Sequence, residues 1–185
     1  IATLCCCPPE SASPSLFLNL SISTSFNASS VRRAISFSSL NPDYQLFMPT
    51  VEKEIKFGAK SDEYADEIAE KFGIKHLYAR HPQSLSEGQK RRVSIAAVVA
   101  TDPEVLILDE PTVGQDYKGL CEMVEVLNKL HEETHNTMIT VTHDKRCAAA
   151  LCDRSIWIKD GKTYKTGGEM LVNEFFDAQS GILKN

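Results

Sequence analysis

Four consecutive aliphatic residues, Val105 to Leu108, run directly into two carboxylates and a proline, Asp109, Glu110 and Pro111. An apolar run of this length, bounded by polar residues, is typical of a strand buried inside a parallel sheet. Parallel α/β sheets bind their ligands in the crevice at the carboxyl ends of the strands. The two acids therefore stand where such a fold carries its chemistry, and no other segment constrains the fold as strongly.

The elements predicted around this strand alternate between helices and strands. Met138 to Val141 is a second short apolar strand, and Asp160-Gly161 between two strand-like segments predicts a hairpin. The alternation predicts an α/β fold with a mostly parallel sheet and helices on both faces. Apolar residues at helical spacing predict the helices, which are 61–72, 87–100, a segment starting near Asp116, and 170–176.

The helix at 87–100 begins with the sequence Leu85-Ser86-Glu87-Gly88-Gln89. Ser84 and Glu87 have the spacing of a capping box. Ser86, Gly88 and the free amides of the first turn could bind an anion, because the helix dipole favours it and Gly88 has no Cβ in the way. A well-capped helix without a ligand is the alternative interpretation. The next three residues are basic and indicate a solvated face, with phosphate contact as the alternative: Lys90, Arg91 and Arg92.

The acids and one histidine suggest a hydrolytic site. Successive side chains of a strand point to opposite sides, so one of Asp109 and Glu110 could hold a magnesium ion, usually through water, and the other could face an attacking water as general base. Two exposed acids at an ordinary strand end are the alternative. His143 follows the second strand, where an imidazole can bond a terminal phosphate and orient the water.

The bulk composition excludes several classes of protein. The net charge of -5 argues against a broad nucleic-acid face, which would be basic. No apolar run approaches the length that spans a bilayer. The spacing of the cysteines suggests neither a disulfide framework nor a zinc site; they are Cys5, Cys6, Cys7, Cys121, Cys147 and Cys152.

The composition changes near residue 40. Residues 1–40 are rich in serine and carry one acid, Glu10, against Arg32 and Arg33. Two interpretations stay open for them: an organelle transit peptide, or a disordered or misassembled leader. Residues 41–168 have the composition of a folded α/β domain, and 169–185 form a C-terminal tail. This division predicts a sheet whose leading strands are missing.

Taken together and in this order, the motifs of residues 41–168 resemble the nucleotide-binding subunit of ABC transporters. Leu85–Gln89 match the family's signature motif, Val105–Glu110 its Walker B strand, Gly114-Gln115-Asp116 its D-loop and His143 its switch histidine. The Q-loop region is similar to that of energy-coupling-factor ATPases, which serve cobalt, nickel and vitamin uptake; it comprises Asn41-Pro42-Asp43-Tyr44-Gln45-Leu46-Phe47 and residues 49–52.

The resemblance implies a P-loop NTPase-like fold with a helical signature subdomain, and an ATPase that uses ATP and Mg²⁺. In this family two subunits bind head to tail, with each ATP between the P-loop of one and the signature motif of the other. Asp109 would then help to hold magnesium, Glu110 would polarise the water, and His143 would contact the γ-phosphate. The residues that would serve the opposite subunit's nucleotide, or signal across the dimer, are Ser86, Gly88, Gln89 and Asp116.

The resemblance also implies partners and a location. A membrane subunit would dock at Asn41–Phe47, which places this protein peripherally on the cytoplasmic side of a membrane. A plastid location is the alternative if the serine-rich leader is a transit peptide.

The chain departs from the family pattern at three places. It contains no Gly-x-x-x-x-Gly-Lys-Ser/Thr motif, and residues 1–40 include no glycine that could form a phosphate nest. Leu40 stands where the Q-loop glutamine is expected, and leucine can neither ligate metal nor orient water. Glu87 stands where glycine is more usual.

Three functional hypotheses follow. The first is an ATPase subunit of an energy-coupling-factor importer for a metal ion or vitamin, defective alone because the P-loop is absent. The second is a non-catalytic regulatory subunit that docks on a transporter's membrane component. The third, an ABC-type ATPase that acts on DNA or ribosomes, is disfavoured by the acidic charge balance.

Overall fold

The computed structural model describes residues 15–21, 35–38, 42–151 and 153–182. Its strands are β1 (Ser15–Ser21), β2 (Ile35–Ser38), β3 (Val105–Asp109), β4 (Thr137–Val141), β5 (Ser155–Lys159) and β6 (Lys162–Gly167). Its α-helices are α1 (Val51–Lys56), α2 (Asp62–Lys71), α3 (Glu87–Val99), α4 (Tyr117–Thr134), α5 (Lys145–Leu151) and α6 (Glu169–Ile182). The short 3-10 helices are η2 (Pro42–Tyr44), η3 (Lys75–Leu77) and η4 (Pro82–Ser84).

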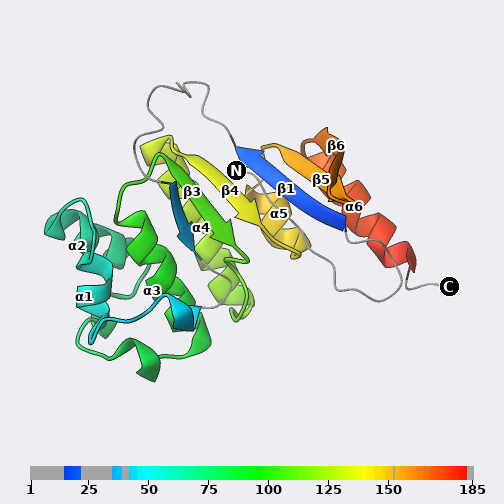
Figure 1. Ribbon diagram of the computed structural model, residues 1–185. Coiled ribbons are helices and arrows are strands. Elements are labelled where there is room, and N and C mark those ends of the chain that lie inside the picture. Colours follow the sequence, from blue (N-terminus) through cyan, green and yellow to red (C-terminus); the bar gives the residue numbers. More distant parts are fainter. Residues whose placement is uncertain (1–14, 22–34, 39–41, 152, 183–185) are drawn as a thin grey trace.

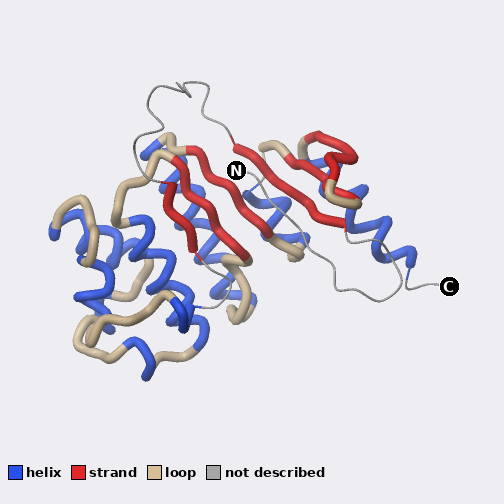
Figure 2. The backbone as a smooth tube through the Cα atoms, in the orientation of Figure 1, coloured by secondary structure: helices blue, strands red, loops and turns tan. Residues whose placement is uncertain are grey.

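Within the described residues the strands form one sheet in the order β2-β3-β4-β1-β5-β6, which Figure 2 traces in red. Strands β2, β3 and β4 pair in parallel, whereas β1 is antiparallel to both β4 and β5, and β6 is antiparallel to β5. Four strands, β2 to β5, therefore point the same way, and β1 and β6 run opposite. The predicted strands at 105–108 and 138–141 and the Asp160-Gly161 hairpin are confirmed.

The division at residue 41 is corrected by the first two strands. Residues 15–21 pair with β4 and β5, and residues 35–38 pair with β3, so parts of the predicted leader belong to the sheet. The sequence of β1, Ser-Leu-Phe-Leu-Asn-Leu-Ser, places leucine at every second position, as a strand requires. Serine-rich surroundings concealed this alternation. The rest of residues 1–40, on which the transit-peptide interpretation also depends, lies outside the described residues.

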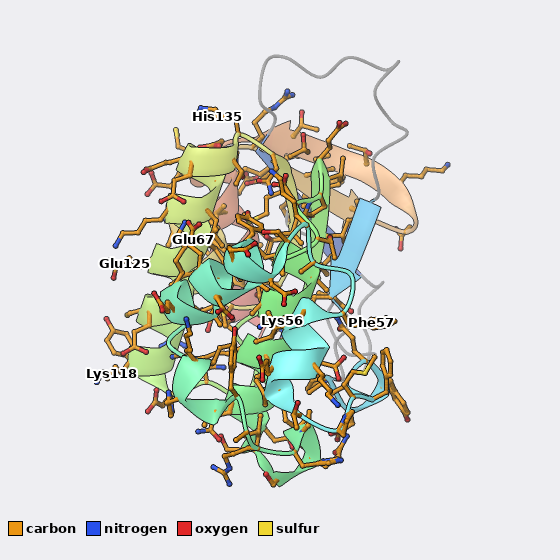
Figure 3. The ribbon with its side chains drawn as sticks, turned by 90° about the vertical axis from the view of Figure 1, so that its left-hand side faces the viewer. Lys56, Phe57, Glu67, Lys118, Glu125 and His135 are labelled. Atoms are coloured by element: carbon orange, nitrogen blue, oxygen red, sulfur yellow. The ribbon has the colours of Figure 1, made fainter. Side chains whose placement is uncertain are left out.

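Helices α4, α5 and α6 cover one face of the sheet (Figures 1 and 3). On this face Leu106 and Leu108 of β3 and Met138 of β4 are buried, together with the apolar side of α4. The opposite face is less protected: Val105 and Ile107 stay half-buried. The prediction of helices on both faces is therefore met on one face only, in the part of the chain that the structure describes.

Helices α1, α2 and α3 form a helical group beyond the β2 end of the sheet (Figure 1). Helix α2 begins where predicted, because Ser61 accepts a hydrogen bond from the amide of Tyr64. Helix α3 starts at Glu87 as predicted, but its capping box differs from the predicted one. Ser86 and Gln89 form the capping box, because Ser86 is extended and directly precedes the helix, whereas Ser84 ends η4.

The C-terminal segment is part of the fold. Helix α6 is longer than the predicted 170–176 and buries Val172 and Phe175 completely. The Phe175 ring meets the Trp157 ring of β5 edge to face, with centroids 5.1 Å apart. The predicted separate tail at 169–185 is thus corrected, because α6 packs against α5 and β5 and forms a second hydrophobic cluster with them.

Candidate functional site

Glu110 lies at the point where β3 ends. Its amide donates to the Val141 carbonyl of β4 at 2.8 Å, which continues the ladder one residue beyond the strand. Its backbone is left-handed, with φ of 49°, a conformation that is uncommon for a residue with a Cβ. The side chain is only 9% exposed. The strand end and this backbone turn together direct a carboxylate into a largely enclosed position.

His143 and Thr142 hold the two oxygens of that carboxylate. The Nδ1 of His143 lies 2.7 Å from Glu110 Oε1, and the Thr142 hydroxyl donates to Oε2 at 3.2 Å. Burial raises the pKa of Glu110, and the contacts with His143 and Thr142 oppose that rise. The structure thus brings Glu110 and His143, two of the predicted site residues, together. A buried carboxylate with a raised pKa is the type of group that can accept a proton from water.

The Thr142 hydroxyl makes a second hydrogen bond in addition to the one with Glu110, because it also accepts from the amide of Asp144 at 3.1 Å. Burial raises the pKa of the Cys147 thiol next to Thr142 to about 12, so this cysteine stays protonated. The loop after β4 is thereby fixed to α5 and to Glu110.

Replacing Glu110 with glutamine should stabilise the isolated chain at neutral pH. The raised pKa means that the folded state binds the proton more tightly than the unfolded state, so stability falls as pH rises through and above the ordinary value of about 4.3. Urea unfolding of wild type and Glu110→Gln from acidic to neutral pH should show a difference that is small in acid and opens as the pH rises. A difference that does not change with pH would contradict this account of Glu110.

Asp109 is the last residue of β3 and is half-buried, with Val141 as its partner on β4. The buried Arg91 of α3 lies close enough that Asp109 and Glu110 both counteract the fall in its pKa that burial causes. No group of three or more His, Cys, Asp or Glu that could hold a metal occurs among the described residues. Asp109 alone suits Mg²⁺ only if phosphate oxygens and waters complete the shell, as is usual for this ion.

Ser86, Gly88 and Gln89 gather at the start of α3. The Ser86 hydroxyl accepts from the Gln89 amide at 3.3 Å, and the Gln89 side chain accepts from the Ser86 amide at 3.1 Å. Gln115 packs onto this turn, because its side-chain amide donates to the Gly88 carbonyl at 2.8 Å. A Cβ at Gly88 would lie 3.1 Å from the Gly114 carbonyl oxygen, a tight contact that would make the loop of Gly114 give by a few tenths of an ångström, so the close approach favours glycine.

Around this turn lies a groove of about 510 Å³ between α3, α4 and η3. Asp116 borders the groove and caps α4, accepting from the Gly119 amide at 2.7 Å. The structure thus assembles two clusters from the predicted residues: Glu110, His143 and Asp109 in one, and Ser86, Gly88, Gln89 and Asp116 in the other.

A comparison with protein families decides the assignment: the model described as "ABC transporter" matches residues 15–113, more than half of the chain. The chain belongs to the ABC transporter family. The match begins at the first residue of β1, in agreement with the corrected boundary of the fold. No helix among the described residues is long and apolar enough to cross a membrane.

Relatives within the ABC transporter family include energy-coupling-factor proteins. The chain is 41% identical over 155 residues to the energy-coupling factor transporter ATP-binding protein EcfA2 of Enterococcus faecalis, covering 79% of this chain and 54% of that protein. It is 43% identical over 162 residues to a putative ABC transporter ATP-binding protein of Methanopyrus kandleri, covering 82% and 60%. The chain thus spans between half and two thirds of the length of these two relatives.

Solved structures of ABC proteins share the fold. CbiO1 of Clostridium perfringens, described as part of the ABC transporter complex CbiONQ, superposes with a TM-score of 0.67 at 33% identity, over 83% of this chain and 63% of that one. A dimeric ATP-binding cassette bound to ADP and Pi superposes with a TM-score of 0.64 at 25% identity, over 78% and 68%. These likenesses confirm the predicted P-loop NTPase-like α/β fold.

The basic residues after the ABC signature motif depart from the sequence prediction. Lys90 is 8% exposed and Arg91 2% exposed, so they do not form a solvated face. Arg92 is half-buried and donates to Glu122 of α4 at 2.7 Å. The apolar residues that follow on α3 are the sequence signal for the burial of Lys90 and Arg91. A helix that is apolar on nearly all sides is buried, and its first turns are then buried with it.

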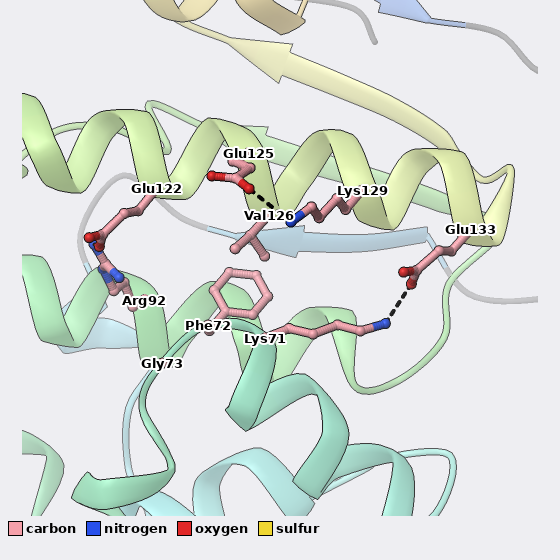
Figure 4. Close-up of a pocket in the computed structure, with 9 residues that line it drawn as sticks. All are labelled: Lys71, Phe72, Gly73, Arg92, Glu122, Glu125, Val126, Lys129 and Glu133. Atoms are coloured by element: carbon pink, nitrogen blue, oxygen red, sulfur yellow. Dashed lines mark hydrogen bonds and ion pairs between the residues drawn. The ribbon is translucent and has the colours of Figure 1, made fainter.

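A second pocket lies between the end of α2 and α4 (Figure 4). Its floor is apolar, with Phe72 and Val126 in contact (Figure 4). Its charged rim is paired internally, through Lys71 with Glu133 at 2.5 Å, Arg92 with Glu122 at 2.7 Å and Lys129 with Glu125 at 2.8 Å. The first two pairs join α2 and α3 to α4, whereas Lys129 and Glu125 both belong to α4. The groove at Ser86 is left as the better candidate for an anion.

Proposed function

We propose that this chain is an ATP-binding subunit of an energy-coupling-factor type importer, whose parent activity couples ATP hydrolysis to the uptake of a metal ion or a vitamin. The observation that carries the proposal is the enclosed Glu110 carboxylate held by His143 and Thr142 at the carboxyl ends of β3 and β4. Glu110 would polarise the attacking water, His143 would contact the γ-phosphate, and Asp109 would hold Mg²⁺ through water.

The second part of the proposal is that this chain does not hydrolyse ATP alone. The backbone amides and the lysine of a P-loop make most of the contacts that bind a triphosphate, and the sequence contains no such motif. Its contribution would then be the groove at Ser86, Gly88 and Gln89, which completes the ATP site of a second subunit in a head-to-tail dimer. Asp116, at the edge of the same groove, would face the dimer contact.

The membrane partner would bind at the segment that follows β2. Asn41 lies outside the described residues, but Tyr44 is 87% exposed and Phe47 66% exposed. Phe47 meets Phe57 edge to face at 5.3 Å, which gives this surface an aromatic centre. The buried Glu54 fixes the segment by accepting from the amides of Phe47 and Met48 at 3.0 and 2.7 Å. Such docking would place the protein peripherally on the cytoplasmic side of a membrane.

Nucleotide binding by the purified chain tests the proposal. We expect no tight, magnesium-dependent ATP binding by the chain alone. We expect ATP-dependent association with a P-loop-bearing ATP-binding subunit of the same family, with one composite site per pair. Unaided turnover of ATP that Glu110→Gln abolishes would contradict the claim that this chain is defective alone, and absence of any association would contradict the dimer.

The exposed aromatics also support a second candidate, a non-catalytic regulatory subunit that occupies the membrane component. Capture of a transporter's membrane subunit that requires Phe47 but tolerates Glu110→Gln and Gly88→Val would favour this candidate. Loss of capture with the Gly88 variant would favour the paired ATPase instead.

A further inference from the structure

The signature motif Leu85–Gln89 contains one acid, Glu87. Glu87 is the first residue of α3 and borders the groove together with Ser86, Gly88 and Gln89. Its side chain is 66% exposed. An acid at this position suits the helix dipole, but an uncompensated carboxylate would repel the polyphosphate of a nucleotide brought by a partner.

Lys90 lies one turn further along α3 and compensates this acid. Its ammonium is 3.2 Å from Glu87 Oε1 and 2.8 Å from Asp43 Oδ1 of η2. Its side chain is only 10% exposed, and the two carboxylates that it contacts belong to different elements, η2 and α3. The hydrogen bonds to Asp43 and Glu87 raise the pKa of Lys90, which keeps the ammonium charged.

We propose that Lys90 is a positioning residue of the signature motif, which neutralises Glu87 and holds its carboxylate toward Asp43. The start of α3 then stays accessible to the terminal phosphates of a nucleotide that the partner subunit carries. This inference rests on the proposed pairing with a P-loop-bearing subunit. It explains how a chain with an acid in place of the usual glycine retains an anion-accepting turn.

The test is ATP-dependent association of the full chain with a P-loop-bearing ATP-binding subunit of the same family whose own general base is changed from Glu to Gln. Sedimentation with Mg-ATP gives the apparent Kd. We expect Lys90→Met to weaken association at least about fivefold, more at low salt, because it leaves a bare carboxylate facing the phosphates. Lys129→Met, which breaks an i,i+4 pair with Glu125 away from the groove, is the matched control and should leave the Kd unchanged.

Two further variants separate neutralisation from a structural role. Adding Glu87→Gly to Lys90→Met should restore the Kd, because the repelling acid is gone. Asp43→Asn should keep the Kd near wild type, because Lys90 still faces Glu87. If Lys90→Met has no effect, if Glu87→Gly fails to rescue it, or if Asp43→Asn weakens association as much as Lys90→Met, the positioning role is wrong. If the wild-type chain does not associate at all, the proposed pairing itself fails and this inference fails with it.

Discussion

Gly88→Val should weaken ATP-dependent association with a P-loop-bearing partner by at least about a hundredfold, equivalent to roughly 2.7 kcal/mol. Even a bare Cβ at this position would meet the Gly114 carbonyl at 3.1 Å and the Gln115 side chain at 3.3 Å. The larger valine must push the loop of Gly114 away from α3 and lies where a phosphate approaches the helix start. The measurement is the apparent Kd from sedimentation with and without Mg-ATP.

The matched control for this substitution is Gly168→Val, between β6 and α6. A Cβ at Gly168 would meet the Asp153 carbonyl at 3.6 Å, an ordinary contact, and Gly168 does not border the groove. We expect association of the control to match wild type. Equal Kd values for Gly88→Val and wild type would show that the turn at Ser86 does not receive the partner's nucleotide.

Phe175→Ala should lower the free energy of unfolding by about 3–5 kcal/mol, the usual result of deleting a buried aromatic ring. Phe175 is completely buried and meets two other rings edge to face, Trp157 at 5.1 Å and Phe176 at 5.0 Å. A loss of this size is a large share of the roughly 5–15 kcal/mol that stabilises an ordinary domain. Urea unfolding followed by the fluorescence of Trp157, the single tryptophan, measures it.

Met170→Ala on the same helix is the control, because Met170 is 88% exposed. It should change the free energy of unfolding by less than about 0.5 kcal/mol. If Phe175→Ala behaves like Met170→Ala, α6 does not contribute to the core.

The sequence predicted the carboxyl ends of β3 and β4 well because the signals there are local. Four aliphatic residues before Asp109 predict the position of β3, and the motif around His143 predicts where β4 ends. Parallel pairing of neighbouring strands then brings Glu110 and His143 together, because both follow the same edge of the sheet. The 2.7 Å contact between them is what that logic predicts.

Local sequence patterns do not specify the structure where two of them suit the same position equally well, or where a short strand lies in a segment of different composition. Ser84 and Ser86 both suit a helix cap, and η4 decided between them by ending at Ser84. Residues 15–21 alternate as a strand does, but the serine-rich composition of the surrounding 40 residues predicts a leader. Lys90 was assigned to solvent because charged residues usually are, and only its contact with Asp43 of η2 shows otherwise.

By itself the sequence determined the order of the motifs, the elements that carry them and the family they resemble, because each of these depends on residues close together along the chain. Tertiary structure alone decided which residues share a site: the Thr142 hydroxyl on Glu110, the Gln115 amide on Gly88, and Lys90 between Glu87 and Asp43. Each of these contacts joins separate elements or depends on burial, and no local spacing rule specifies where two distant elements meet.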